Sequence, residues 1–168
     1  MDLSRRPVCI AGRLLYNESH MIAFKNLKEI LHITLQWEQS LKDFYDVAEF
    51  ALKSEDSKKA VRLLRANLEE KLAVLRGVKP EDFGKTEWIR FTLDYKPEEL
   101  TPGLSRASDA GEIFRHLVDF QGKLAGVYAR IAETIVSRGQ KELFESLARF
   151  KEEQGAEVRR LQDNYRPD

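Results

Sequence analysis

Four long stretches of this 168-residue chain place apolar residues at the spacing of one face of an α-helix, and this pattern limits the fold more than any other feature. Representative positions are Ile30, Trp37, Leu41 and Leu52 in the first stretch, Val61, Leu64, Leu68 and Leu72 in the second, Ile113, Leu117, Leu124 and Ile131 in the third, and Leu143, Leu147, Val158 and Leu161 in the fourth. A helix with one apolar stripe must bury that stripe against another element. The sequence therefore predicts an all-α protein built from four long helices.

The ends of these stretches carry residues that start and stop helices. The first stretch runs between Ile22 and Lys53, and Asp56 or Ser57 is the expected N-cap of the second helix. Gly77 is expected to end the second helix in the C′ position. Asp109 and Glu112 form a capping-box-like start for the third helix. Gly139 is expected to separate the third helix from the fourth.

Residues 78–107 hold three of the five prolines and show no sustained helical period. Long loops without helices or strands are uncommon in a compact domain. We therefore interpret this segment as a crossover that links helices at opposite ends of a bundle. The strand-like stretch at residues 89–95 lies inside it and has no obvious partner strand. The prediction is one domain of residues 1–168, with a short N-terminal extension at 1–21 and two helical hairpins joined by the crossover.

Charge and cysteine content narrow the function classes. The 28 Lys and Arg balance the 28 Asp and Glu, so no basic field favours nucleic acid, and no stretch is long enough to span a membrane. A single cysteine, Cys9, excludes an intrachain disulfide framework and fits a cytoplasmic protein. The pair Arg5 and Arg6 before apolar residues resembles an export signal, but Arg13 interrupts the apolar run and no cleavage site follows. We therefore expect a cytoplasmic location.

Polar side chains interrupt or flank the apolar stripe of every predicted helix. They are Glu38 in the first helix, Glu69 beside the stripe of the second, Gln121 in the third, and Lys151 and Gln154 in the fourth. The first and third helices share a further detail, since Glu38 lies seven residues before Tyr45 and Gln121 lies seven before Tyr128. This repetition indicates two related helical hairpins.

With these residues the chain resembles the ferritin-like superfamily, and within it the rubrerythrin-like carboxylate bundles. The resemblance implies that the first and third helices each supply a Glu about seven residues before a Tyr, while the other two each supply Glu-x-x-His, and that these six groups hold two irons. Carried over by position, Glu38 and Glu69 keep their carboxylates. Leu72 stands in place of the first His and Gln121 in place of the third-helix Glu. Lys151 and Gln154 replace the last Glu and His, so two of six ligands remain.

No shift of register restores the metal site. The chain has one Glu-x-x-His, from Glu29 to His32, and it lies on the first helix, where the resemblance needs none. An ammonium about 4 Å from a divalent ion would cost roughly 8 kcal/mol at an effective dielectric constant of about 20. We therefore expect no cofactor, and iron or manganese only if Glu38 and Glu69 still bind metal.

Two arrangements of Lys151 remain open. It replaces the charge of the metal by pairing with Glu38 and Glu69, in a network completed by Gln121, Gln154 and either Tyr45 or Tyr128, or it reaches solvent and leaves these groups to water. Gly122 and Gly126, with Ala125 and Ala129, form a small-residue surface on the third helix, with packing inside the bundle as the default and a homodimer as the alternative.

The resemblance, together with the four metal ligands that this chain lacks, leaves three possible functions. The first is a non-enzymatic structural or interaction module that has lost its di-iron site. The second is an iron-dependent oxidoreductase of the rubrerythrin type that uses the residual carboxylates, although the chain lacks the Cys-x-x-Cys pairs of a rubredoxin-like electron-transfer domain. The third is a small-ligand site in the bundle core. Protein partners are not named by any feature of the sequence.

Overall fold

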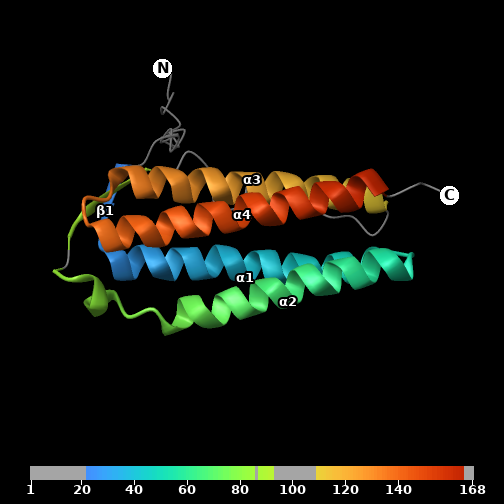
Figure 1. Cartoon of the computed structure of the whole chain (residues 1–168), viewed down its shortest axis with the longest axis horizontal. Helices are drawn as coiled ribbons and strands as arrows, with labels where there is room; N and C mark the ends of the chain where they lie inside the picture. Colours follow the sequence, from blue (N-terminus) through green and yellow to red (C-terminus); the bar gives the residue numbers. More distant parts are fainter. Residues whose placement is uncertain (1–21, 86, 93–108, 165–168) are drawn as a thin grey trace, which may run out of the picture.

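The protein is all-α with four long helices, described by a computed structural model over residues 22–85, 87–92 and 109–164. Helix α1 spans Leu27–Ala51 and α2 spans Glu55–Gly77. Helix α3 spans Ala110–Thr134 and α4 spans Arg138–Asn164. The helices lie nearly parallel or antiparallel along one long axis, in the arrangement of a four-helix bundle (Figure 1).

Two helical hairpins make up the bundle. Helix α1 packs against α2, and α3 packs against α4. Helix α2 ends beside the start of α1, whereas α3 begins at the opposite end of the bundle (Figure 1). The connection between the hairpins therefore has to cover the length of the bundle, which confirms the reason given for the crossover. Its residues 93–108 and the N-terminal extension 1–21 lie outside the described residues.

Local capping explains where the helices begin. The Asn26 side chain accepts a hydrogen bond from the Glu29 backbone N–H, and Glu29 returns one to Asn26, so α1 starts with a capping box. Asp109 caps α3 through the Glu112 N–H at 2.7 Å, as predicted. Ser54 is the N-cap of α2, so the prediction of Asp56 or Ser57 was wrong.

Two glycine assignments also need correction. Gly77 is the last residue of α2 and is followed by Val78 as C-cap in an extended conformation, so it does not form the left-handed stop that was predicted. Gly139 lies inside the first turn of α4, because that helix already begins at Arg138. Helices α2 and α3 end at C-cap residues in an extended conformation. These residues are Val78 for α2 and Ile135 for α3.

A two-stranded antiparallel ribbon closes one end of the bundle. Strand β1, Ile22–Lys25, pairs with β2, Ile89–Thr92, so the strand-like stretch in the crossover does have a partner. The first helical stretch was predicted to run from Ile22, but its first residues form β1 and α1 begins only at Leu27. Phe91 of β2 is buried and stacks on Trp37 of α1 with ring centres 6.3 Å apart. The ribbon therefore extends the apolar core beyond the helices. Between the strands, η2 forms a short 3₁₀ turn at Pro80–Phe83.

Most of the small-residue surface of α3 does not pack inside the bundle, since Ala125 is buried but Ala129 is exposed. Gly122 and Gly126 are exposed, and a Cβ at either position would have no atom within 4 Å. A close contact between α3 and α4 involves a glycine of α4 instead, since a Cβ at Gly155 would be 3.5 Å from Cβ of Gln121. The default expectation for Gly122 and Gly126 was therefore wrong, and the homodimer stays a prediction.

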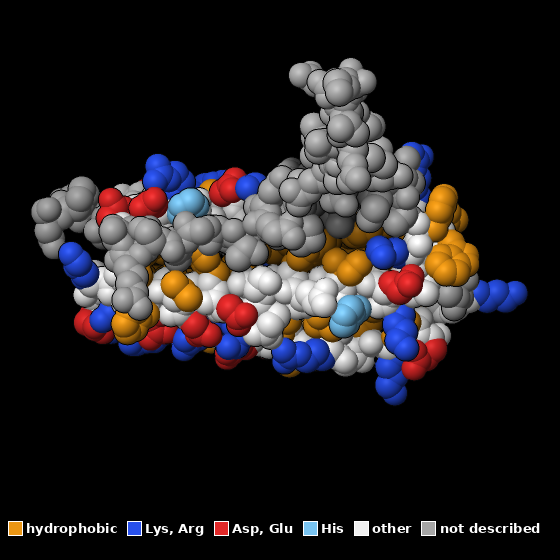
Figure 2. Space-filling model, turned by 180° about the vertical axis from the view of Figure 1, so that it is seen from behind, with side chains coloured by type: hydrophobic (Ala, Val, Ile, Leu, Met, Phe, Trp, Pro, Cys, Tyr) orange, Lys and Arg blue, Asp and Glu red, His pale blue; other side chains and the backbone are white. Residues whose placement is uncertain are grey.

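The outer surface mixes charges of both signs. On the face seen in Figure 2, basic and acidic side chains alternate along the described helices, without a region of one sign. Among the helices that the structure describes, none is long and apolar enough to cross a bilayer.

Candidate functional site

A buried ion pair links two helices near the middle of the bundle. Lys151 of α4 is 0% exposed and Glu38 of α1 is 1% exposed. The Lys151 ammonium donates to Oε2 of Glu38, and the Tyr128 hydroxyl of α3 donates to Oε1 of the same carboxylate at 2.6 Å. Glu38 thus accepts hydrogen bonds from two other helices. The alternative in which Lys151 reaches solvent is wrong.

A second, uncharged pair lies two helical turns away. Nε2 of Gln121 donates to the Tyr45 hydroxyl over 2.8 Å, and both residues are buried. Helices α1 and α3 run in opposite directions (Figure 1), so their matching seven-residue spacings bring the polar residue of each helix opposite the tyrosine of the other. Glu38 therefore pairs with Tyr128, and Gln121 with Tyr45.

Burial changes the acid–base behaviour of these groups. It lowers the pKa of Lys151, and the nearby charge of Lys71 lowers it further, while the charge and hydrogen bond of Glu38 act in the opposite direction. Burial also raises the pKa of both Tyr45 and Tyr128, with the negative charge of Glu38 adding to the shift. The two phenols consequently stay protonated at neutral pH.

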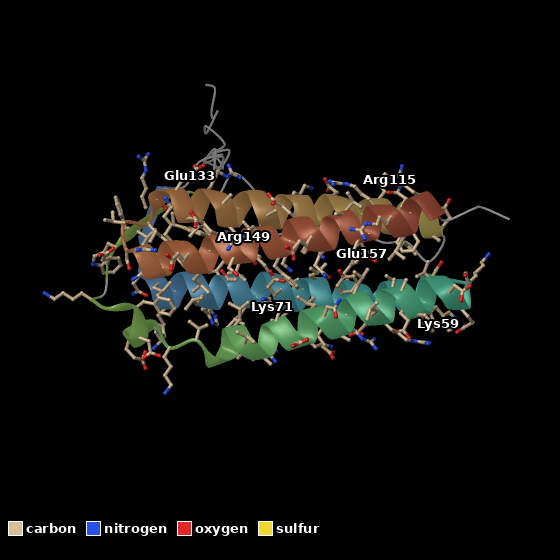
Figure 3. The ribbon with its side chains drawn as sticks, viewed as in Figure 1. Lys59, Lys71, Arg115, Glu133, Arg149 and Glu157 are labelled. Atoms are coloured by element: carbon tan, nitrogen blue, oxygen red, sulfur yellow. The ribbon has the colours of Figure 1, made fainter. Side chains whose placement is uncertain are left out.

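Aromatic rings complete the surroundings of the ion pair. The Lys151 nitrogen lies 5.0 Å from the centre of the Phe150 ring, and Lys71 of α2 lies 4.9 Å from the same centre. Figure 3 labels Lys71 on α2. The Tyr128 ring contacts Trp37 and Phe144, with ring centres 6.3 and 6.4 Å away. The sequence stripe alone did not single out Phe150 as a partner of Lys151.

Helix α2 contributes no polar group to this network. Leu72, where the resemblance would require a histidine, is 1% exposed and belongs to the apolar core. Glu69 has a half-exposed side chain, and its Oε1 lies 3.4 Å from Nζ of Lys42 at the surface. Because each helical residue is rotated by about 100°, Glu69 lies off the stripe formed by Leu68 and Leu72. The predicted pairing of Lys151 with Glu69 was therefore wrong.

Several buried side-chain oxygens on the helices of the network lack a hydrogen-bond partner among the described residues. Gln154 of α4 is buried, as predicted, and its Oε1 has no hydrogen-bond partner among the described residues. The same holds for Oε1 of Gln121 and for Oγ1 of Thr34. The chain thus retains more buried acceptors than its described donors satisfy. Thr34 was missed as a site residue, since a threonine on an apolar stripe is a weak signal.

The residues present do not fit a pair of iron ions. Within the described ranges, no group of three or more His, Cys, Asp and Glu side chains is placed to hold a metal ion. Glu29 caps α1, and His32 is exposed with its Nε2 3.2 Å from the Gln36 amide. One buried carboxylate already paired with an ammonium lacks both the charge and the number of ligands that hard divalent ions prefer.

Comparisons with known proteins do not supply a family for the chain. No family model matches it, and neither curated proteins nor solved structures gave a match.

Proposed function

We propose that this chain is a ferritin-like bundle of the rubrerythrin type that has replaced its di-iron centre with a metal-free polar network, and that it acts as a structural or interaction module. One observation carries the proposal: the Lys151 ammonium is fully buried against Glu38, at the position where the resemblance places a metal-binding Glu. A resident cation there supplies the positive charge that neutralises the core carboxylate.

The pairing of the hairpins supports the same proposal. Glu38 bonds to Tyr128 while Gln121 bonds to Tyr45, so the two polar pairs occupy equivalent places in the two halves. In the resemblance, both places carry a carboxylate. Gln121 removes one negative charge and Lys151 neutralises the other, which leaves a core without net charge.

Elemental analysis of the purified protein tests this function. We expect no iron or manganese at stoichiometric amounts, in the wild type or in a Glu38→Gln variant, whose amide keeps the side-chain shape. Stoichiometric metal that is lost in Glu38→Gln, with the fold retained by circular dichroism, would overturn the proposal. Metal that stays in Glu38→Gln would indicate binding elsewhere on the chain.

A constructive variant tests the positional correspondence with the family. The substitutions Leu72→His, Gln121→Glu, Lys151→Glu and Gln154→His restore the missing ligands. We expect the folded variant to bind iron or manganese, with lower affinity than a complete site because Glu69 lies at the surface. A folded variant that binds neither metal would show that the correspondence is wrong.

A small ligand in the core is a second candidate. Oε1 of Gln121 and Oε1 of Gln154 are buried acceptors without a donor among described residues, and a bound molecule with hydrogen-bond donors would satisfy them. Native mass spectrometry of the purified chain tests this candidate. A stoichiometric adduct that is released on unfolding would favour it over a fully closed core.

A further inference from the structure

A pocket of about 450 Å³ lies at the end of the bundle where α1 and α4 begin. Its walls come from the first turn of α1, from the connection after α2 and from the first turn of α4, including Leu27, Lys28, Glu81, Lys85 and Gln140. Its volume is in the range of pockets that hold small molecules. Gln140 precedes Lys151 by 11 residues on one helix, which corresponds to about 16 Å, so this pocket is separate from the core network.

The walls of the pocket are held in place by the fold. The η2 turn packs onto the start of α4, since a Cβ at Gly139 would lie 3.4 Å from the Phe83 ring. Gly84 then turns the chain with φ of 92°, a left-handed conformation that favours glycine. These two glycines bring the connection close to the α4 terminus and position Lys85 at the pocket.

A buried glutamine with an unsatisfied side-chain oxygen is among the residues that line the pocket. Gln140 is 2% exposed, and its Oε1 has no hydrogen-bond partner in the part of the chain that the structure describes. Leaving such an acceptor without a donor costs about 1–3 kcal/mol. A ligand that offers a hydroxyl or amine to this amide would recover that free energy.

The pocket also has an excess of positive charge. Lys28 and Lys85 line it together with one acid, Glu81. The N-terminus of α4 lies there, and its first helical backbone bond is that of Lys141 to Ser137, which leaves the earlier N–H groups of the turn without an intrahelical acceptor. The start of α1 has its own cap in Asn26 and Glu29. Helix N-termini favour anions through these groups and through the helix dipole.

We propose that this pocket binds a small organic anion, a carboxylate or a phosphate ester, that also carries a hydrogen-bond donor. The anionic group is attracted by Lys28, Lys85 and the N-terminus of α4. The donor pairs with the Gln140 amide. Neither the core network nor a metal takes part.

Titration of the full chain with matched probes tests this site, using two-dimensional amide NMR at an ionic strength of about 20 mM to limit screening. The probes are glycerate, propionate, glycerol phosphate and glycerol. We expect glycerate to bind more tightly than propionate, which lacks hydroxyl groups, and glycerol to bind weakest. Comparing glycerate with glycerol phosphate shows whether a carboxylate or a phosphate is preferred. Binding of propionate as tight as that of glycerate would refute the role of Gln140.

Two variants separate the contributions of charge and amide. The double variant Lys28→Gln with Lys85→Gln should raise the dissociation constants of glycerate and glycerol phosphate by about tenfold. Gln140→Leu should abolish the preference for glycerate over propionate and leave propionate binding unchanged. The control is Lys59→Gln near the start of α2, at the far end of the bundle (Figure 3).

The outcomes decide the proposal even if Gln140→Leu is unstable, because the lysine variant changes only exposed side chains. No saturable binding of glycerate or glycerol phosphate by the wild type would overturn it. An equal loss of affinity in Lys59→Gln and in the double lysine variant would also overturn it, since the attraction would then come from the overall charge.

Discussion

Charged residues join helices both in the core and on the surface of this bundle. In the core, Glu38 and Lys151 link α1 to α4 and are almost fully buried. On the surface, Arg65 of α2 donates to Asp46 and Glu49 of α1 at 2.6 and 2.8 Å. A cation meets carboxylates in both places, an ammonium in the core and a guanidinium at the surface, but the core pair alone of the two has been removed from water.

This difference in solvation determines what each contact contributes. A surface ion pair loses little hydration and adds little to the free energy of unfolding. A buried pair must offset the desolvation of both ions through its mutual attraction and its hydrogen bonds. Glu38 achieves this offset with two donors, Lys151 and Tyr128. The core pair therefore makes the fold depend on both partners being present together.

Breaking the core pair should have the largest effect. Lys151→Met leaves the Glu38 carboxylate buried without its counter-charge, and we expect the free energy of unfolding to fall by about 3–5 kcal/mol. The double variant Glu38→Leu with Lys151→Met removes both charges, so it should recover most of that loss. Urea denaturation measures both. A double variant that loses as much as the two single variants combined would show that the pair does not act as a unit.

The two tyrosines sharpen the comparison within the core. Tyr128→Phe removes a hydrogen bond to a carboxylate, and we expect a loss of about 1.5–3 kcal/mol. Tyr45→Phe removes the acceptor of the neutral Gln121 amide and should cost less, about 1 kcal/mol. Urea denaturation of the two variants in parallel ranks them. Equal losses would indicate that the charge of Glu38 adds nothing to its bond with Tyr128.

Alkaline pH tests the burial of Tyr45. Its pKa is raised in the folded protein, whereas an unfolded tyrosine titrates near pH 10. Above pH 10 the unfolded chain releases this proton and the folded chain keeps it, so stability falls as the pH rises. Between pH 9 and 11 the wild type should lose about 1.4 kcal/mol more than Tyr45→Phe.

The lowered pKa of Lys151 acts with the opposite sign. Its contribution to stability increases as the pH rises from the lowered value toward 10.5. This contribution is present in both the wild type and Tyr45→Phe, so the difference between the two proteins isolates the phenol. Parallel stability curves from pH 9 to 11 would contradict the burial of Tyr45.

The surface cluster should show the smallest effect. Arg65→Ala breaks its bonds to Asp46 and Glu49, and we expect a loss of about 0.2–1 kcal/mol at low salt. About 1 M salt should remove most of this difference, because the pair is accessible to ions. Lys151→Met serves as the comparison, since its effect should persist at high salt. A salt-independent effect of Arg65→Ala would place this cluster with the buried pair.

The apolar periodicity determined most of the fold. Long stripes such as Val61 to Leu72 give nearly the same helix in any compact context, since one face must leave water. The ribbon could not be predicted because β1 and β2 are four residues each and are separated by about 65 positions in the chain. Strands that short need a partner brought by the tertiary fold before their pattern carries meaning.

For the core network, the sequence by itself determined which polar residues share the buried stripes, because helical spacing specifies the face of Glu38, Gln121 and Lys151. Only the tertiary structure decided their partners. Glu69 directly follows Leu68 of the apolar stripe and stays at the surface. One residue along a helix is a rotation of about 100°, and the apolar periodicity alone does not decide whether a side chain at the edge of the stripe is buried. The pairing of Glu38 with Tyr128 and Lys151 depends on the relative positions of α1, α3 and α4 along the bundle, and that alignment is set by packing between helices.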